Sequence, residues 1–186
     1  TITCRLSGYV RLLPCLTTDG AKECADRLFD GWHRFFGIPD RIVSDRDKLF
    51  VSQFWQALYK RLGTHLQMSS GFHAETDGRS EKTNKTAVQV LRMSIGRDQT
   101  DWVPKLPATE FALNSALNVA TGKTPFEMLL GYTPTLAPSG PLDADASASV
   151  EELLEERSLI LKEARDALLA AKVRRSEERR VGKECS

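Results

Sequence analysis

The stretch RIVSDRDKLF (residues 41–50) decides the fold class, because it places a short apolar strand immediately before a polar loop. The strand is predicted at Arg41–Ser44 and the loop at Asp45–Lys48. A helix is predicted from Val51 to Leu62, where apolar residues recur at helical spacing and a glycine follows. His65–Met68 is then predicted to be another strand.

The residues before this unit add one strand and one helix. Tyr9–Leu16 mixes β-branched, aromatic and leucine residues, and Pro14 within it indicates an edge strand or a bulge. Ala21–Phe36 is predicted to be a helix that ends at Gly37. Its apolar face is expected to carry Cys24, Ala25, Leu28, Trp32, Phe35 and Phe36. The alternation of strands and helices predicts an α/β layered domain.

The residues after this unit are mostly predicted to be helical. A polar loop at Ser69–Gly78 leads into a helix at Ser80–Ile95, and two helical segments follow at Trp102–Asn118 and Thr124–Leu130. In the helix 80–95 an inner stripe of Ala87, Val90, Leu91 and Ser94 is expected on a different face from Lys82, Lys85, Gln89 and Arg92. We predict that residues 1–132 form one domain.

A linker and a long charged helix are expected beyond this domain. Residues 133–149 are rich in proline, glycine and small polar residues, which is typical of a linker. Residues 150–174 are predicted to form an amphipathic helix with an acidic start and a basic end, as the helix dipole favours. A helix that packs on the domain or on a neighbour is favoured over a coiled coil, because Arg157 interrupts the apolar seam.

Composition excludes several classes of protein. With 186 residues, 41% hydrophobic and 27% charged, the chain is neither a disordered acidic tail nor collagen-like nor a disulfide-dense miniprotein. The 26 basic and 25 acidic side chains nearly cancel, so bulk charge does not indicate a nucleic-acid partner. No apolar run is long enough to span a membrane, and no membrane partner is expected. Cys4, Cys15 and Cys24 are expected to be buried, reduced thiols.

Asp45 and Glu81 are the candidate metal ligands. Asp45 directly follows a short strand, where an acidic side chain is displayed at the edge of a sheet. Glu81 is expected in the first turn of the helix 80–95, where the dipole favours a negative charge. If that helix packs beside the strand, both carboxylates can bind one divalent cation, as Mg²⁺ prefers. Because 25 acids supply many pairs, spacing alone does not separate this pair from solvated surface charge.

Several motifs around these two acids resemble one family. They are SDRDKLF at 44–50, FHAETDGRSEKTN at 72–84, TGKTPFE at 121–127 and LGYTP at 130–134. In this order they resemble the integrase catalytic core of gypsy-type long-terminal-repeat retrotransposons, which belongs to the retroviral integrase superfamily. The 35 residues between Asp45 and Glu81 match the separation of the second Asp and the Glu in that family.

The resemblance implies an RNase H-like fold and a DNA strand transferase that depends on Mg²⁺ or Mn²⁺. Such enzymes process the 3′ ends of element DNA and join them to target DNA. Asp45 matches the second metal-binding Asp of the family and Glu81 its metal-binding Glu, whereas Asp47 is interpreted as a loop residue. Asn84 and Lys85 match positions beside the acidic site that face DNA. The implied partner is DNA, with self-association as a further possibility.

A basic helix supports a DNA partner independently of the resemblance. From Gly78 to Arg97 the chain carries five basic residues and one acid, Glu81. The candidate DNA-binding residues are Arg79, Lys82, Asn84, Lys85 and Arg92. Contacts of this kind go to phosphates, so we expect salt-sensitive binding with a weak target-sequence preference. The alternative interpretation is that these basic residues form a solvent-exposed helix face with no DNA partner. His73 is interpreted as a loop anchor or a DNA contact, Glu75 as a loop residue, and Asp77 as a turn residue or a DNA-proximal residue.

The family also uses a third acid, on a strand that comes before the segment that Cys4–Val10 resembles. We therefore expect an RNase H-like integrase core that lacks its first strand, carries a helical C-terminal extension and has an incomplete catalytic triad. Such a fragment is expected to have little or no strand-transfer activity. Ala74 also departs from the family, which favours proline at that position.

We assign no function to residues 175–186. The segment from Arg175 to Cys185 matches, residue for residue, a translation of a widely used sequencing-adapter oligonucleotide. We interpret it as a sequence artefact rather than as a charged tail or a nuclear-localisation-like run.

Three functions compete at this point. The first is an integrase core fragment that acts on DNA in the nucleus, with a cytoplasmic stage before import. The second is a non-catalytic nucleic-acid-binding remnant of a transposable element. The third is an interaction protein whose active part is the helix 150–174.

Overall fold

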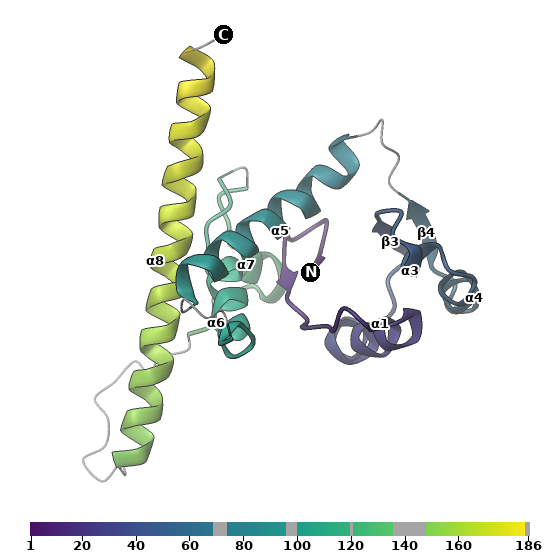
Figure 1. Cartoon of the computed structure of the whole chain (residues 1–186), viewed down its shortest axis with the longest axis horizontal. Helices are drawn as coiled ribbons and strands as arrows, with labels where there is room; N and C mark the ends of the chain where they lie inside the picture. The colour runs from purple at the N-terminus through teal and green to yellow at the C-terminus, as the bar shows by residue number, and fades with distance from the viewer. Residues whose placement is uncertain (69–73, 96–99, 120, 136–147, 185–186) are drawn as a thin grey trace. The chain divides into compact units, whose positions relative to one another are not determined.

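The computed structural model describes residues 1–68, 74–95, 100–119, 121–135 and 148–184, with the backbone alone for 74–80, 148–149, 171–172 and 174–184. The chain divides into two compact units. The first unit contains Thr1–Ile2 and Leu13–Lys82, and the second contains Thr3–Leu12 and Thr83–Ser186. Short strands and helices alternate along the first unit (Figure 1), which confirms the predicted α/β class.

The first unit contains a parallel pair of strands with helices before and between them. Its elements are α1 (Ala21–Leu28), η1 (Phe29–His33), α2 (Arg34–Phe36), β3 (Arg41–Ser44), α3 (Lys48–Val51), α4 (Gln53–Leu62) and β4 (His65–Met68). β3 and β4 pair in parallel with Arg41 opposite His65 and Ser44 opposite Met68. Both strands have the bounds that the sequence predicted. The connection through α4 is the crossover that a parallel pair requires.

An aromatic core fills the space between α1, α4 and the strands. Trp55 and Tyr59 are 2% and 0% exposed, and they pack with Ala25 and with the partly buried Ile42 and Leu66. The Trp55 ring lies 5.0 Å from the Tyr59 ring, measured between centroids. These contacts hold α4 against the face of the strand pair.

The helix predicted at Ala21–Phe36 is interrupted by the π-helical segment η1. Phe35 and Phe36 were expected on its inner face, but they are 54% and 40% exposed, whereas Gly31 and His33 are buried. A π-helical turn is wider than an α-helical one, so the residues that follow it are rotated back around the axis. The prediction for Phe35 and Phe36 was therefore wrong because it assumed one uniform helical period.

The remaining elements lie mainly in the second unit. They are β1 (Ile2–Thr3), β2 (Val10–Arg11), α5 (Ala74–Ser94), α6 (Trp102–Ser115), α7 (Pro125–Leu130) and α8 (Ala148–Glu184). β1 and β2 form a two-stranded sheet. The strand predicted at Tyr9–Leu16 is thus reduced to Val10–Arg11.

Two side chains of α6 hold the outer edge of β2. Asn114, which is fully buried, accepts a hydrogen bond from the Val10 N–H at 2.8 Å and donates one to the Val10 carbonyl at 2.9 Å. One turn earlier, Glu110 accepts from the Leu12 N–H at 2.8 Å and pairs with Arg11 at 2.8 Å. Burial raises the pKa of Glu110, and its bonds to Leu12 and Arg11 oppose that rise. The two side chains take the place of a neighbouring strand.

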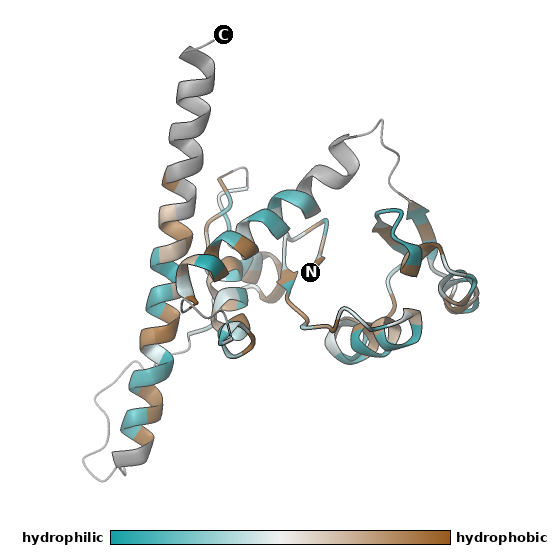
Figure 2. Cartoon of the chain, in the orientation of Figure 1, coloured by the Kyte–Doolittle hydropathy of each residue, from teal (hydrophilic) through white to brown (hydrophobic). Residues whose placement is uncertain are grey.

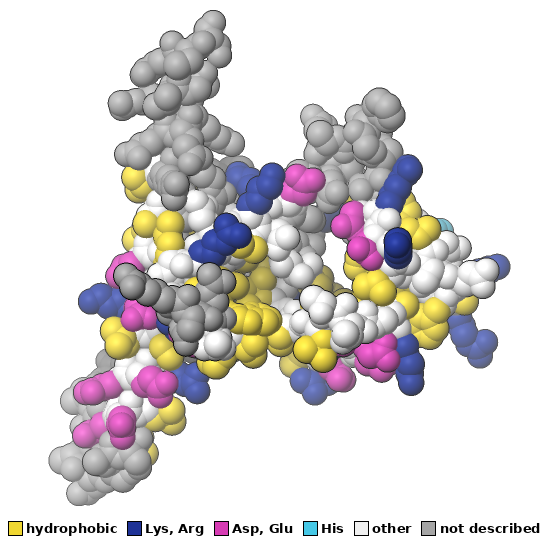
Figure 3. Space-filling model, in the orientation of Figure 1, with side chains coloured by type: hydrophobic (Ala, Val, Ile, Leu, Met, Phe, Trp, Pro, Cys, Tyr) yellow, Lys and Arg dark blue, Asp and Glu magenta, His cyan; other side chains and the backbone are white. Residues whose placement is uncertain are grey.

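Small residues let α6 and α8 pack closely. Ala112 on α6 and Ala164, Ala167 and Leu168 on α8 are buried together with Val90 of α5. The described part of α8 shows alternating bands of hydrophobic and hydrophilic residues (Figure 2). Acidic side chains gather around its N-terminal part (Figure 3), where Glu151, Glu152, Glu155 and Glu156 are exposed.

Several predicted boundaries differ from the structure. α5 begins at Ala74 instead of Ser80, because Ala and Glu are good helix formers and an acid is favoured in a first turn. Glu75 and Asp77, interpreted as loop residues, therefore lie on a helix. α8 runs from Ala148 to Glu184, past the predicted end near Arg174. Within the described residues, no helix is long and apolar enough to cross a membrane.

The cysteines of the described chain are free thiols, as predicted. Their predicted burial was wrong, however, because Cys15 is exposed and Cys4 and Cys24 are only partly buried. Cys24 packs against the edge of the aromatic core of the first unit.

Candidate functional site

Asp45 lies where the sequence predicted it, directly after the C-terminal end of β3. It is exposed, and its Oδ1 accepts a hydrogen bond from the Asp47 backbone N–H at 3.3 Å. The bond turns the chain sharply after the strand, as aspartate commonly does in such turns. A carboxylate at this position is accessible to a ligand at the carboxyl end of the strand pair.

Two helix caps fix the loop that carries Asp45. Asp47 caps α3, because its Oδ1 accepts from the Leu49 N–H at 2.9 Å. Ser52 caps α4 by accepting from the Trp55 N–H at 3.2 Å, and its hydroxyl donates to the Leu49 carbonyl at 2.7 Å. Asp47 is therefore a structural loop residue, as predicted.

Glu81 lies on α5 and its side chain is exposed. Because α5 begins at Ala74, Glu81 is two turns into the helix and not in the first turn. The predicted stabilisation by the helix dipole was therefore wrong, since that effect is confined to the terminal turn. Glu81 and Asp45 both belong to the first unit.

The exposed face of α5 is basic, as predicted. Lys82, Lys85 and Arg92 are exposed, whereas Ala87 and Val90 on the inner face are 2% and 0% exposed. Glu81 lies on the same side of the helix as Lys85 and Arg92, since residues four and seven apart share a helical face. Asn84, one turn before Val88, is also exposed.

Part of the predicted site lies outside what the structure describes. The structure describes neither the side chain of Arg79 nor any part of His73. Among the described side chains, no group of three or more His, Cys, Asp or Glu gathers in a way that could hold a metal ion. The roles of Asp45 and Glu81 as metal ligands stay a prediction. Two carboxylates nevertheless suit Mg²⁺, which is usually bound by one or two of them together with water and phosphate.

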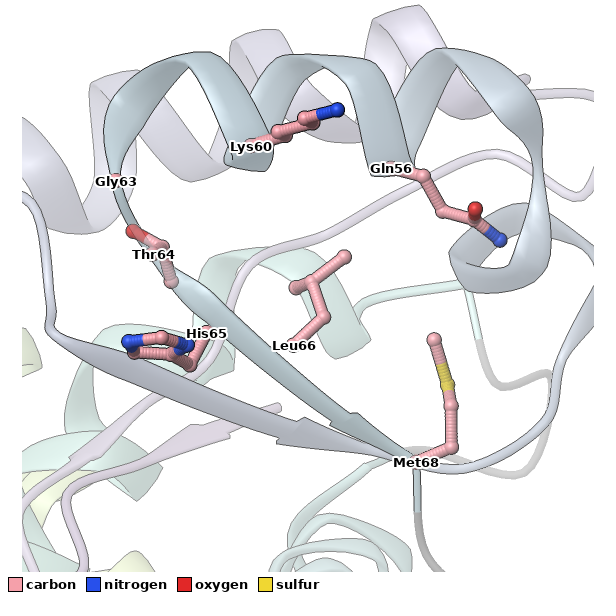
Figure 4. A pocket seen from close by; sticks show the side chains of 7 residues that line it. All are labelled: Gln56, Lys60, Gly63, Thr64, His65, Leu66 and Met68. Atoms are coloured by element: carbon pink, nitrogen blue, oxygen red, sulfur yellow. The ribbon is translucent and has the colours of Figure 1, made fainter.

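Sequence reasoning did not find a groove between α4 and β4, which we call the α4–β4 groove. Its volume is about 500 Å³, and its lining includes Gln56, Lys60, Thr64, His65, Leu66 and Met68 (Figure 4). The sequence offers one indication of this groove. Gln56 and Lys60 lie four residues apart, and so on one face, of a helix that leads directly into a strand.

A second cavity, of about 610 Å³, lies in the second unit at the end of α5. Lys105 is one of the residues that line it. The Lys105 Nζ donates a hydrogen bond to the Ser94 carbonyl and lies 3.2 Å from an Asp101 carboxylate oxygen and 3.9 Å from a Glu163 carboxylate oxygen. Lys105 therefore caps the C-terminal end of α5, where the dipole favours a positive charge. This role is structural.

Comparison with known proteins relates the chain to mobile genetic elements. No protein-family model matches it. It is 33% identical over 135 residues to the transposon Tf2-3 and Tf2-4 polyproteins of Schizosaccharomyces pombe, a match that covers 72% of this chain. The chain spans about one tenth of the length of these curated relatives, since it covers 10% of each.

A solved structure shares the fold. It is a chain from the simian T-cell lymphotropic virus intasome in complex with the PP2A regulatory subunit B56 gamma. The TM-score is 0.50 at 16% sequence identity, and the match covers 72% of this chain and 48% of that one.

Proposed function

Because this chain is homologous to a segment of the Tf2 retrotransposon polyproteins and has an integrase-like fold, we propose that it is the catalytic-core segment of a retrotransposon integrase. The 33% identity over 135 residues carries this proposal. The exposed carboxylate after β3 and the exposed basic face of α5 support it. The substrate is DNA, and the nucleus is the proposed site of action, because chromosomal DNA is there.

Asp45 and Glu81 are the proposed ligands of Mg²⁺ or Mn²⁺. Such an ion, when bound, activates an attacking hydroxyl and stabilises the leaving oxygen of a phosphodiester. The contribution of this chain is to supply hard oxygen ligands, Asp45 from a loop that two helix caps hold in place and Glu81 from α5. Lys82, Asn84, Lys85 and Arg92 are proposed to bind the DNA backbone along α5, on the helix that carries Glu81, and Arg79 is included with them on sequence grounds.

Manganese binding tests the carboxylate pair without depending on enzymatic activity. Asp45→Asn and Glu81→Gln should each weaken Mn²⁺ binding to the full chain, followed by water-proton relaxation. Asp26→Asn is the matched control, because Asp26 is an exposed acid on α1. Unchanged Mn²⁺ affinity in both site variants, or an equal loss in the control, would contradict the metal assignment.

A DNA-joining assay with Mg²⁺ tests the catalytic part of the proposal. In a chain that also carries the family's first strand and its Asp upstream of Thr1, joining of a labelled DNA end to a plasmid should be lost in Asp45→Asn and in Glu81→Gln and kept in Asp26→Asn. Joining that is undiminished in either site variant would show that the carboxylates do not act in catalysis.

A non-catalytic nucleic-acid-binding protein is the second candidate, favoured by the basic face of α5, which needs no metal to attract phosphate. Under this alternative, duplex DNA binds in the presence of EDTA and is not joined with Mg²⁺. Lys85→Gln should lower the slope of log affinity against log salt by about one under either candidate. The joining assay therefore separates the two candidates, and the salt slope tests the shared interface.

A further inference from the structure

The α4–β4 groove has one basic end and one apolar end. Lys60 is exposed in the last turn of α4, and no carboxylate lies within ion-pair distance of it among the described residues. Leu66 and Met68 rise from β4 towards α4, and Gln56 points from α4 towards Met68 (Figure 4). Leu66 and Met68 share a face of the strand, because side chains two residues apart do so.

One edge of β4 is free of strand neighbours within the described chain. β4 pairs with β3 along its other edge, and the His65 N–H donates to the Asp40 carbonyl at 2.9 Å on that side. Successive residues of a strand direct their backbone groups to opposite edges, so Leu66 directs its N–H and C=O away from β3. The lining of the groove comes from α4, β4 and the turn between them and includes no residue of β3, so the groove opens on the side of β4 to which these free backbone groups point.

β4 carries no proline, lysine or bulge that would block pairing at its free edge. Proteins prevent pairing at such edges with proline, lysine or a bulge, or by covering the edge. The sequence of β4 is HLQM, and it pairs with β3 in unbroken register over all four residues. Gly63, at φ +74°, ends α4 and returns the chain directly into β4, so α4 lines the groove beside the free edge instead of covering it.

We propose that the α4–β4 groove binds an extended peptide, which adds as a strand along the free edge of β4. A carboxylate of the peptide lies at Lys60, and an apolar side chain two residues away lies over Leu66 and Met68. Strand addition of this kind takes its affinity from main-chain hydrogen bonds and its specificity from alternate side chains. A second copy of β4 is disfavoured as the occupant, because it would bring a second Lys60 to the same basic groove.

Methionine methyl NMR on the full chain tests the location of binding. The chain has three methionines, Met68, Met93 and Met128, so ¹³C-methyl labelling gives three assignable signals. The probes are the blocked peptides acetyl-Thr-Glu-Thr-Leu-Thr-amide and its reversed sequence, which cover both strand directions. One of them should shift the Met68 signal and leave Met93 and Met128 unchanged. No shift at Met68, or equal shifts at all three, would overturn the proposal.

N-methylated peptides test strand addition itself. Two versions of the binding peptide are made, each methylated at one alternate set of backbone nitrogens. Only one edge of an added strand faces β4, so one version should keep its affinity and the other should lose at least about tenfold. Equal behaviour of the two versions, whether both bind or neither does, would exclude strand addition.

The charge of the groove is tested with neighbouring residues of α4. Lys60→Gln should weaken the glutamate peptide by about two- to fivefold, the range expected for an exposed ion pair. Arg61→Gln makes the same change of charge at the next, exposed residue, which does not line the groove, and should have little effect. A peptide with lysine in place of glutamate should bind the unaltered chain more weakly. Equal losses in the two variants would mean that only net charge matters, and would contradict a site at Lys60.

Discussion

Aromatic side chains hold α4 in the first unit, whereas small side chains form the contact of α6 with α8 in the second unit and a buried amide holds β2 there. In the first unit Trp55 and Tyr59 fill the space between α4 and the strand pair. In the second unit Ala112, Ala164 and Ala167 allow close helix packing, and Asn114 holds a strand. Removing a large side chain should therefore destabilise the first unit, and inserting a larger side chain should destabilise the α6–α8 contact of the second.

The largest expected effect is the loss of Trp55. Trp55→Ala should lower the free energy of unfolding by about 3–5 kcal/mol, because it leaves a large cavity in the aromatic core. Trp55→Phe should cost much less, since the indole Nε1 has no hydrogen-bond partner in the described chain. Chemical denaturation followed by circular dichroism measures both, and equal losses would show that the aromatic volume is not what stabilises this unit.

Asn114→Ala should come next, at about 2–4 kcal/mol. The substitution leaves the N–H and the carbonyl of Val10 buried without partners, and each unpaired group costs about 1–3 kcal/mol. Hydrogen exchange should accelerate in β2 and α6 and change little in β3 and β4. Equal acceleration of hydrogen exchange in both units would mean that the two units unfold together, and that Asn114 does not stabilise the second unit alone.

Ala164→Leu tests the small-residue packing of α6 against α8. Overpacking a tight contact costs about 1–3 kcal/mol. Ala170→Leu adds the same atoms at an exposed position of α8 and should be nearly neutral. Thermal unfolding compares the two variants, and an equal shift in both would indicate that the α6–α8 contact is loose.

The smallest expected effect is a pH dependence that comes from His33. Its Nδ1 donates to the Gly37 carbonyl at 3.1 Å, and its Nε2 accepts from the Tyr59 hydroxyl at 3.1 Å. Burial lowers the pKa of His33 below its ordinary 6.5, so the unfolded chain takes up the proton first. The stability that the neutral ring contributes is present above pH 6.5 and is lost as the pH falls through the folded pKa.

His33→Gln should flatten this part of the stability profile, measured by denaturation between pH 5 and 8. His65→Gln, at an exposed histidine of the same unit, is the control. A profile that flattens in the control and not in His33→Gln would place the proton uptake elsewhere.

The strand pair was fully predictable, and the helix before it was only partly so. β3 and β4 have the predicted bounds because each is a short segment with two apolar residues between clear turn signals. η1 was not predicted, because the apolar spacing of Ala21–Phe36 fits a uniform helix as well as it fits an interrupted one. The burial of Gly31 and His33 follows from that interruption.

Asp45 and the basic face of α5 were predictable from local order alone. An acid after a strand and cations at helical spacing are properties of the neighbouring residues. The α4–β4 groove and the hydrogen bonds of Asn114 depend on residues that are distant in the sequence: Asn114 and Val10 are 104 positions apart. No periodic pattern specifies such a pair, although an amide within an apolar helix does indicate a buried partner.

The position of Asn114 and Glu110 has a consequence for how the small sheet of β1 and β2 can grow. Their side chains occupy the backbone groups of Val10 and Leu12 that an incoming strand would use. Recruitment of another strand on that side would first require α6 to release two buried bonds. Any enlargement of this sheet must therefore proceed in one direction only, from β1 outward.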